Sequence, residues 1–127
     1  MTGGRLLLDT HVFLWWRSTP EKLREEARTA IAEAEIVFVS AASAWEAAIK
    51  GALGRLEIPG SIEAGVLDSG FERLPITFAH VERTGQLPLH HRDPFDRLLI
   101  AQAQAEDLKL VTHDRALEAY AVPILWA

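Results

Sequence analysis

The sequence predicts a single α/β domain in which helices cover a central, mainly parallel β-sheet. Short apolar runs suited to strands alternate with longer helical stretches along the chain, a pattern typical of parallel sheets with helices on both faces. The 127 residues, of which 49% are hydrophobic, suffice for one substantial core. No repeat, low-complexity tract or long linker divides the chain, so we expect one domain over residues 1–127.

The first third of the chain is expected to alternate two strands with two helices. Residues 5–8 form a short apolar run, and the aromatic segment 10–17 is predicted to be helical. Thr19-Pro20-Glu21 combines an N-cap, a proline at the first helical position and an acid in the first turn, so a helix is expected from there to about residue 35. Residues 36–40 do not alternate in polarity, which indicates a strand buried on both faces.

Helices are predicted over most of the middle of the chain, and short strands and a short helix near its end. Ser43-Ala44-Trp45-Glu46 fits the S-x-x-E capping box and predicts a helix over 43–53, ended by Gly54. Asp93-Pro94 predicts the start of a long apolar helix that reaches about residue 107. The other expected elements are a turn at 57–60, a short helix at 61–69, a short strand within 71–76, a helix at 77–85, a strand at 109–112, a short helix at 115–120 and a last strand at 122–125.

Four acidic residues lie where a strand gives way to a helix or within a helix's first turn: Asp9, Glu46, Asp96 and Asp114. Because the carboxyl ends of parallel strands meet at one edge of the sheet, these side chains are predicted to converge there. Clustered carboxylates repel one another unless a cation binds, and a hard divalent metal prefers oxygen ligands. Phosphoryl transfer is the chemistry that such a centre usually supports.

Each of these acids also has a purely structural explanation. Asp9 and Asp114 could serve as N-caps of the helices that follow them. Glu46 could complete the capping box and pair with Lys50 one helical turn later. Each explanation is respectable alone, but four acids at one rim are better explained by a metal site.

Asp93 and Asp96 compete for the role of cap at the start of the long helix. Only one cap is needed there, and the helix that follows is too apolar to be exposed. We therefore assign Asp93 as the cap and Asp96 as the functional acid.

Composition and missing motifs argue against several other classes of protein and of active site. The net charge of −5 argues against a protein that holds nucleic acid by bulk electrostatics, and the absence of cysteine excludes a thiolate nucleophile or a sulfur-bound zinc site. No nucleotide-binding loop or serine-nucleophile motif is present, and the histidines lack the helical spacing of a zinc site. We expect neither a signal peptide nor a membrane-spanning helix, which favours the cytoplasm.

Four segments together resemble the PIN-domain ribonucleases, most closely the toxins of VapC-type toxin–antitoxin pairs. They occur in family order and span essentially the whole chain. The segments are Leu7-Leu8-Asp9-Thr10-His11, Ser43-Ala44-Trp45-Glu46 with Lys50, His91-Arg92-Asp93-Pro94-Phe95-Asp96-Arg97-Leu98-Leu99-Ile100-Ala101, and Val111-Thr112-His113-Asp114. The third is the most distinctive.

The resemblance implies a PIN-like α/β/α sandwich and a ribonuclease that depends on Mg²⁺ or Mn²⁺. By position, Asp9 and Asp96 resemble the principal metal ligands, and Glu46 and Asp114 the acids that complete the site, some of them through water. Thr112, together with Thr10, resembles the hydroxyls that orient the cluster. The expected partners are RNA as substrate, a cognate antitoxin that inhibits the enzyme, and a second copy of the chain in a homodimer or a larger toxin–antitoxin assembly.

Two alternatives and one group of residues stay open at the level of sequence. A phospho-accepting receiver domain has a similar length and also uses clustered aspartates with magnesium, and a PIN-like domain could act only in partner binding. The arginines that flank the acids could contact phosphate or form surface ion pairs; they are Arg92, Arg97 and Arg115.

Overall fold

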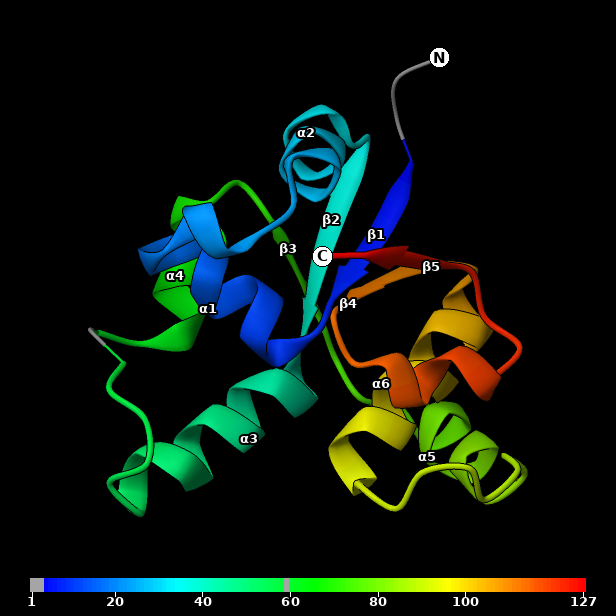
Figure 1. Cartoon of the computed structure of the whole chain (residues 1–127). Coiled ribbons are helices and arrows are strands. Elements are labelled where there is room, and N and C mark those ends of the chain that lie inside the picture. The colour runs from blue at the N-terminus through cyan, green and yellow to red at the C-terminus, as the bar shows by residue number, and fades with distance from the viewer. Residues whose placement is uncertain (1–3, 59) are drawn as a thin grey trace.

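The computed structural model of the chain describes residues 4–58 and 60–127. Its centre is a five-stranded sheet of order β3-β2-β1-β4-β5, in which all four strand pairings are parallel (Figure 1). The strands are β1 (Arg5–Leu8), β2 (Ile36–Ser40), β3 (Glu72–Leu74), β4 (Lys109–Thr112) and β5 (Ile124–Trp126). The predicted α/β fold with a parallel sheet is confirmed.

Helices cover both faces of the sheet (Figure 1). They are α1 (Thr10–Ser18), α2 (Glu25–Glu33), α3 (Ala41–Ala52), α4 (Ile62–Asp68), α5 (Phe78–Thr84) and α6 (Pro94–Glu106), with short 3₁₀ helices at Pro20–Lys22 and Arg115–Ala119. The alternation of side chains along β1 divides the core in two. Leu6 and Leu8 belong to the cluster under α1, α2 and α4, whereas Leu7 belongs to the cluster under α6.

The strand order places a topological switch point at the carboxyl ends of β1 and β4. From β1 the chain proceeds to β2 and β3 on one side of the sheet, whereas β4 and β5 lie on the other side. Leu8 pairs in register with Val111, so Asp9 and Thr112, the next residues of the two segments, emerge side by side. Ligand sites in open α/β sheets form at such a point.

Two predicted helices differ from those in the structure. The helix expected from Thr19 to residue 35 is interrupted, because Leu23 and Arg24 are extended (ψ 144° and 148°) and Leu23 enters the core. The helix expected at residue 43 begins at Ala41, where Ser40 caps it by accepting a hydrogen bond from the Ala42 amide at 2.9 Å. The S-x-x-E capping box therefore does not form.

The end of the chain is shifted slightly from the prediction, and one predicted turn cannot be compared. The last strand occupies Ile124–Trp126 rather than 122–125, and the helix expected at 115–120 is a 3₁₀ helix. The turn at 57–60 includes Pro59, which lies outside the described residues. Within the described ranges, none of the helices combines the length and the hydropathy needed to cross a bilayer.

Candidate metal centre

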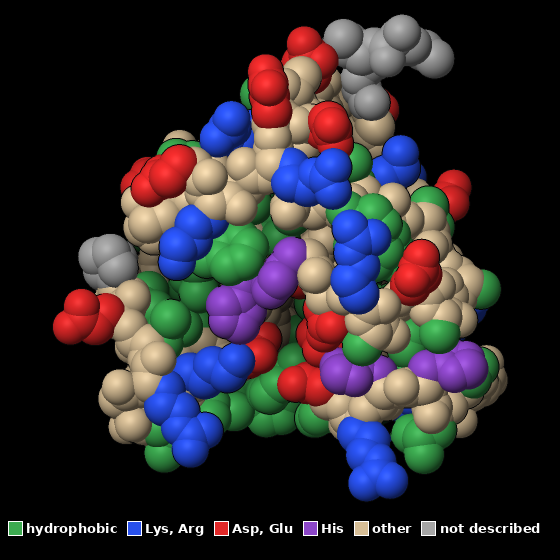
Figure 2. All heavy atoms as spheres, viewed as in Figure 1, with side chains coloured by type: hydrophobic (Ala, Val, Ile, Leu, Met, Phe, Trp, Pro, Cys, Tyr) green, Lys and Arg blue, Asp and Glu red, His purple; other side chains and the backbone are tan. Residues whose placement is uncertain are grey.

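A cleft of about 330 Å³ opens at the carboxyl ends of β1 and β4. Figure 2 shows acidic and histidine side chains gathered around this hollow, with Lys and Arg side chains beyond them. Its lining comprises Asp9, Thr10, His11, Glu46, Lys50, Asp93, Asp96, His113, Asp114 and Arg115. All four acids that the sequence singled out therefore reach one cleft.

Asp9 is a buried carboxylate at the end of β1. Its Oδ1 accepts a hydrogen bond from the Val12 amide at 2.8 Å, so it does cap α1, as the structural explanation required. Its Oδ2 accepts a second bond from the Thr112 hydroxyl at 2.5 Å. Burial raises the pKa of Asp9 above its ordinary value despite these two bonds. Capping thus does not exclude a second role, because each carboxylate oxygen keeps a free lone pair.

Thr112 links the acids at the ends of the two central strands. Its fully buried hydroxyl donates to Asp9 and accepts from the Asp114 amide at 3.1 Å. Asp114 in turn caps the following 3₁₀ helix through the Ala116 amide, at 3.0 Å from its Oδ1. One hydroxyl thereby fixes the relative position of Asp9 and Asp114.

Glu46 approaches the cleft from α3 and is also buried. The Thr10 hydroxyl donates to its Oε1 at 2.6 Å, and the Lys50 ammonium lies 2.8 Å from its Oε2. The predicted i,i+4 pair between Glu46 and Lys50 is therefore present. It neutralises Glu46, while the Thr10 hydroxyl ties α1 to α3.

Asp96 lies in the first turn of α6, beside the helix cap. Asp93 is that cap, as predicted, since its Oδ1 accepts from the amides of Phe95 at 2.8 Å and Asp96 at 3.1 Å. The carboxylate of Asp96 is free to face the cleft. Burial, helped by the negative charges of Asp93 and Asp9, raises the pKa of Asp96 to about 6 against the opposing contact with His91.

His91 is a residue of this centre that the sequence did not single out. Its Nε2 lies 2.8 Å from Asp96 Oδ2 and 3.7 Å from Asp114 Oδ2. A loop histidine five residues before an acid matches no metal-binding spacing on a helix, so its position in the sequence did not indicate a metal ligand. Its place in the third PIN-like segment was the signal that could have drawn attention to it.

The three flanking arginines have different environments in the structure. The guanidinium of Arg97 donates to backbone carbonyls, among them those of Thr84 and Pro88 at 2.8 and 2.9 Å, and is used to hold a loop. Arg115 lines the cleft and stacks on Trp126, with its guanidinium carbon 4.0 Å from the ring centroid. Arg92 is exposed. Arg115 is therefore the arginine best placed to contact a phosphate in the cleft.

The residues of the cleft fit a divalent metal. Within the described ranges, no Lys or Arg forms an ion pair with Asp9, Asp96 or Asp114, although burial disfavours ionisation of Asp9 and Asp96. A cation with oxygen ligands would relieve this electrostatic cost. The donor set of carboxylates with an adjacent imidazole is thus suited to metal-assisted hydrolysis.

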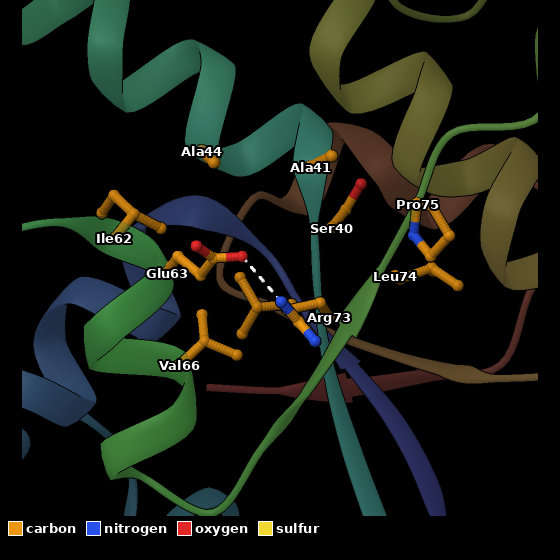
Figure 3. Close-up of a pocket in the computed structure, with 10 residues that line it drawn as sticks. Ser40, Ala41, Ala44, Ile62, Glu63, Val66, Arg73, Leu74 and Pro75 are labelled. Atoms are coloured by element: carbon orange, nitrogen blue, oxygen red, sulfur yellow. Dashed lines mark hydrogen bonds and ion pairs between the residues drawn. The ribbon is translucent and has the colours of Figure 1, made fainter.

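A second hollow, of about 500 Å³, differs in character from the acidic cleft. It lies between the start of α3, helix α4 and strand β3, where Ile62, Val66 and Leu74 contribute apolar side chains (Figure 3). An ion pair between Glu63 and Arg73, at 2.8 Å, spans it. This hollow does not contain the converging acids, so the chemistry is assigned to the cleft.

Comparison with known proteins identifies a matching family and a related sequence. The family described as PIN domain matches residues 6–123 of the chain. Ribonuclease VapC22 of Mycobacterium tuberculosis is 31% identical over 121 residues, which cover 93% of each protein.

Solved structures show the same fold at low sequence identity. The VapBC2 structure from Rickettsia felis, bound to a promoter DNA fragment, matches with a TM-score of 0.70 and 14% identity, over 95% of this chain and 97% of the other. The DNA-bound VapBC structure from Salmonella typhimurium matches with a TM-score of 0.64 and 21% identity, over 96% and 97%.

Proposed function

This chain belongs to the PIN-domain family, and we propose that it is a ribonuclease toxin that hydrolyses RNA phosphodiester bonds with a bound divalent metal, Mg²⁺ or Mn²⁺. The observation that carries the proposal is the convergence of Asp9, Glu46, Asp96 and Asp114 on one cleft at the switch point of the sheet. Family membership removes the basis for the receiver-domain alternative.

We assign the acids of the cleft to two tasks. Asp9, Asp96 and Asp114 would hold the metal, because among the four predicted acids they are the three without a Lys or Arg partner in the described part of the chain. A bound divalent ion would polarise the scissile phosphate and lower the pKa of the attacking water. Glu46, held by Thr10 and Lys50, would orient that water from the wall formed by α3. Thr112 keeps Asp9 and Asp114 in register.

The basic side chains of the cleft supply the contacts to substrate. Lys50 and Arg115 line its walls, and we assign them the contacts to the scissile phosphate: Arg115 directly, and Lys50 from its ion pair with Glu46. A bound metal with these local side chains would suffice to hold a single phosphodiester, which reconciles nucleic-acid chemistry with a chain of net charge −5.

The relatives also suggest the partners. VapC22 is a ribonuclease, and the matching solved structures include DNA-bound VapBC assemblies. We therefore propose that a cognate antitoxin inhibits this enzyme in the cytoplasm, and that the toxin forms a homodimer within such assemblies. Exposed Trp45 and Ile49 of α3, with the C-cap residue Leu53, form an apolar stripe at intervals of four residues that offers a docking surface for an apolar antitoxin segment.

Cleavage of RNA by the purified chain tests the enzymatic proposal. We expect cleavage in Mg²⁺ or Mn²⁺, its loss in excess EDTA, and its recovery when the metal is restored. Asp96→Asn should lower the rate by at least about a hundredfold, since it removes a charged ligand without changing the size of the side chain.

Asp107→Asn is the matched control at the other end of α6. Asp107 is exposed and adopts the left-handed conformation (φ 57°), which asparagine also tolerates, so this variant should cleave RNA normally. Cleavage that persists in EDTA or in Asp96→Asn would refute the mechanism and leave partner binding as the function.

A further inference from the structure

We propose that His91 contributes a nitrogen ligand to the metal held by Asp96 and Asp114, so that this centre favours a transition-metal ion such as Mn²⁺ over Mg²⁺. The inference rests on the proposed function, because it presumes a metal in the acidic cleft. It concerns a residue outside the four acids, and its test does not require an RNA substrate.

The geometry places one nitrogen against two carboxylates. His91 Nε2 and one carboxylate oxygen each from Asp96 and Asp114 all lie within 4.8 Å of one another. Two ligands of one ion at about 2.1 Å lie at most about 4.2 Å apart, so only small side-chain rotations are needed to enclose an ion. These side chains are 25%, 20% and 37% exposed, respectively, so an ion can enter from solvent.

The loop before α6 is anchored so that it holds His91 in this position. The His91 amide donates to the Tyr120 hydroxyl at 2.9 Å, and the Arg97 guanidinium donates to the same hydroxyl at 3.2 Å. Arg97 also binds the carbonyls of Thr84 and Pro88. Tyr120 thus fixes the His91 backbone and Arg97 fixes Tyr120 and the loop, so the ring is directed at the acids before any metal binds.

A ligand role explains the contacts of His91 better than a role in orienting Asp96 alone. An orienting partner needs one carboxylate, whereas the Nε2 of His91 faces Asp96 and Asp114 at once. The neutral Nε2 of histidine is the commonest nitrogen donor to metals in proteins. Imidazole suits transition metals, whereas Mg²⁺ prefers oxygen, so a nitrogen donor shifts the selectivity of the centre.

Pulsed electron paramagnetic resonance of the Mn²⁺-loaded protein tests the ligand directly. Imidazole nitrogen bound to Mn²⁺ gives a ¹⁴N modulation that oxygen ligands do not give. We expect this modulation in the wild-type protein, its loss in His91→Gln, and its retention in His90→Gln and His113→Gln. His90 is the neighbour in sequence and turns toward Tyr120, with ring centroids 5.1 Å apart, and His113 is an exposed histidine that lines the cleft.

A comparison of affinities distinguishes ligation from positioning. If His91 binds the metal, His91→Gln should weaken Mn²⁺ binding by at least about tenfold and Mg²⁺ binding by clearly less, so that the Mn²⁺/Mg²⁺ selectivity falls. If His91 only orients Asp96, both affinities should fall by the same factor. Calorimetric titration of each ion into the metal-free protein gives both values.

The results that would overturn the inference are specific. A wild-type spectrum without ¹⁴N modulation, a modulation that survives in His91→Gln, or equal losses for the two ions would each refute the ligand role. Mn²⁺ binding with oxygen ligands alone would still leave the proposed nuclease intact. A protein that binds neither ion would overturn both proposals.

Discussion

At Asp96 the fold places a carboxylate where burial and two neighbouring acids oppose its ionisation. The pKa of Asp96 is about 6 in the folded chain, against 3.8 for an ordinary aspartate. Between pH 3.8 and about 6, Asp96 is therefore more fully protonated in the folded state than in the unfolded state. Consequently this group's contribution to the free energy of unfolding is most favourable at low pH and is lost as the pH rises through about 6.

This residue predicts a pH dependence of stability in the metal-free protein. The rise of the pKa from 3.8 to about 6 corresponds to a loss of up to about 3 kcal/mol as Asp96 ionises, of which about 2 kcal/mol falls above pH 4.5. Urea unfolding in EDTA between pH 4.5 and 7 measures that part. Asp96→Asn cannot ionise, so its stability should fall less over this range. Parallel profiles for the two proteins would contradict the prediction.

Thr112 predicts a second effect at the scale of one residue. Thr112→Val removes the only hydroxyl that donates to buried Asp9 among the described contacts, and should reduce the free energy of unfolding by about 1–3 kcal/mol. Thr112→Ser keeps the hydroxyl and should retain most of the hydrogen-bond contribution. Urea denaturation in EDTA gives both values, and a loss in Thr112→Ser that exceeds the loss in Thr112→Val would show that the methyl group, not the hydroxyl, is responsible.

At the scale of the element, the start of α3 shows how a local motif can mislead. Ser40 ends β2 and caps the helix. The N-cap therefore lies three residues before Ser43, the first residue of the S-x-x-E motif. Ser43 is consequently inside the helix, where its hydroxyl is buried without a partner among the described residues. Glu46 is then free to face the cleft instead of its own helix terminus.

The two serines predict opposite effects on stability. Ser40→Ala should lower the free energy of unfolding by about 1 kcal/mol, because it removes the cap. Ser43→Ala should raise it by about 0.5–1 kcal/mol, because it removes an unpaired buried hydroxyl and alanine favours the helix. Thermal or urea unfolding of both variants measures the difference. A larger loss in Ser43→Ala than in Ser40→Ala would restore the capping-box interpretation.

For the whole molecule, catalysis and partner binding are expected to use different surfaces. The acids lie in the cleft, whereas Ile49 and Leu53 point to solvent from α3. Ile49→Asp with Leu53→Asp should therefore prevent co-purification with the proposed cognate antitoxin, while the free enzyme still cleaves RNA.

Leu67→Asp is the control for this separation of surfaces, because Leu67 is an equally exposed apolar residue on α4. This variant should keep both the partner and the activity. If the α3 variant retains its partner, the antitoxin binds elsewhere.

Much of this protein was determined by local sequence pattern. The alternation of apolar runs with helical stretches predicted the parallel sheet, because strand and helix periodicities are local properties. The position of Asp9 after one strand and Asp114 after another predicted their convergence, because parallel strands end at one edge. The capping role of Asp93 could also be predicted from local sequence, since the amides that it binds lie only two and three residues away.

Tertiary structure alone decided how the acids differ from one another. Thr112 reaches Asp9 across 103 positions of the sequence, and Thr10 reaches Glu46 across 36. The loop that holds His91 against Asp96 and Asp114 depends on Tyr120, far along the chain. Burial, hydrogen bonding and pKa follow from such long-range contacts, which no local periodicity encodes. The four acids could thus be found in the sequence, but the nitrogen beside them and the unequal cost of ionising them emerged only from the folded chain.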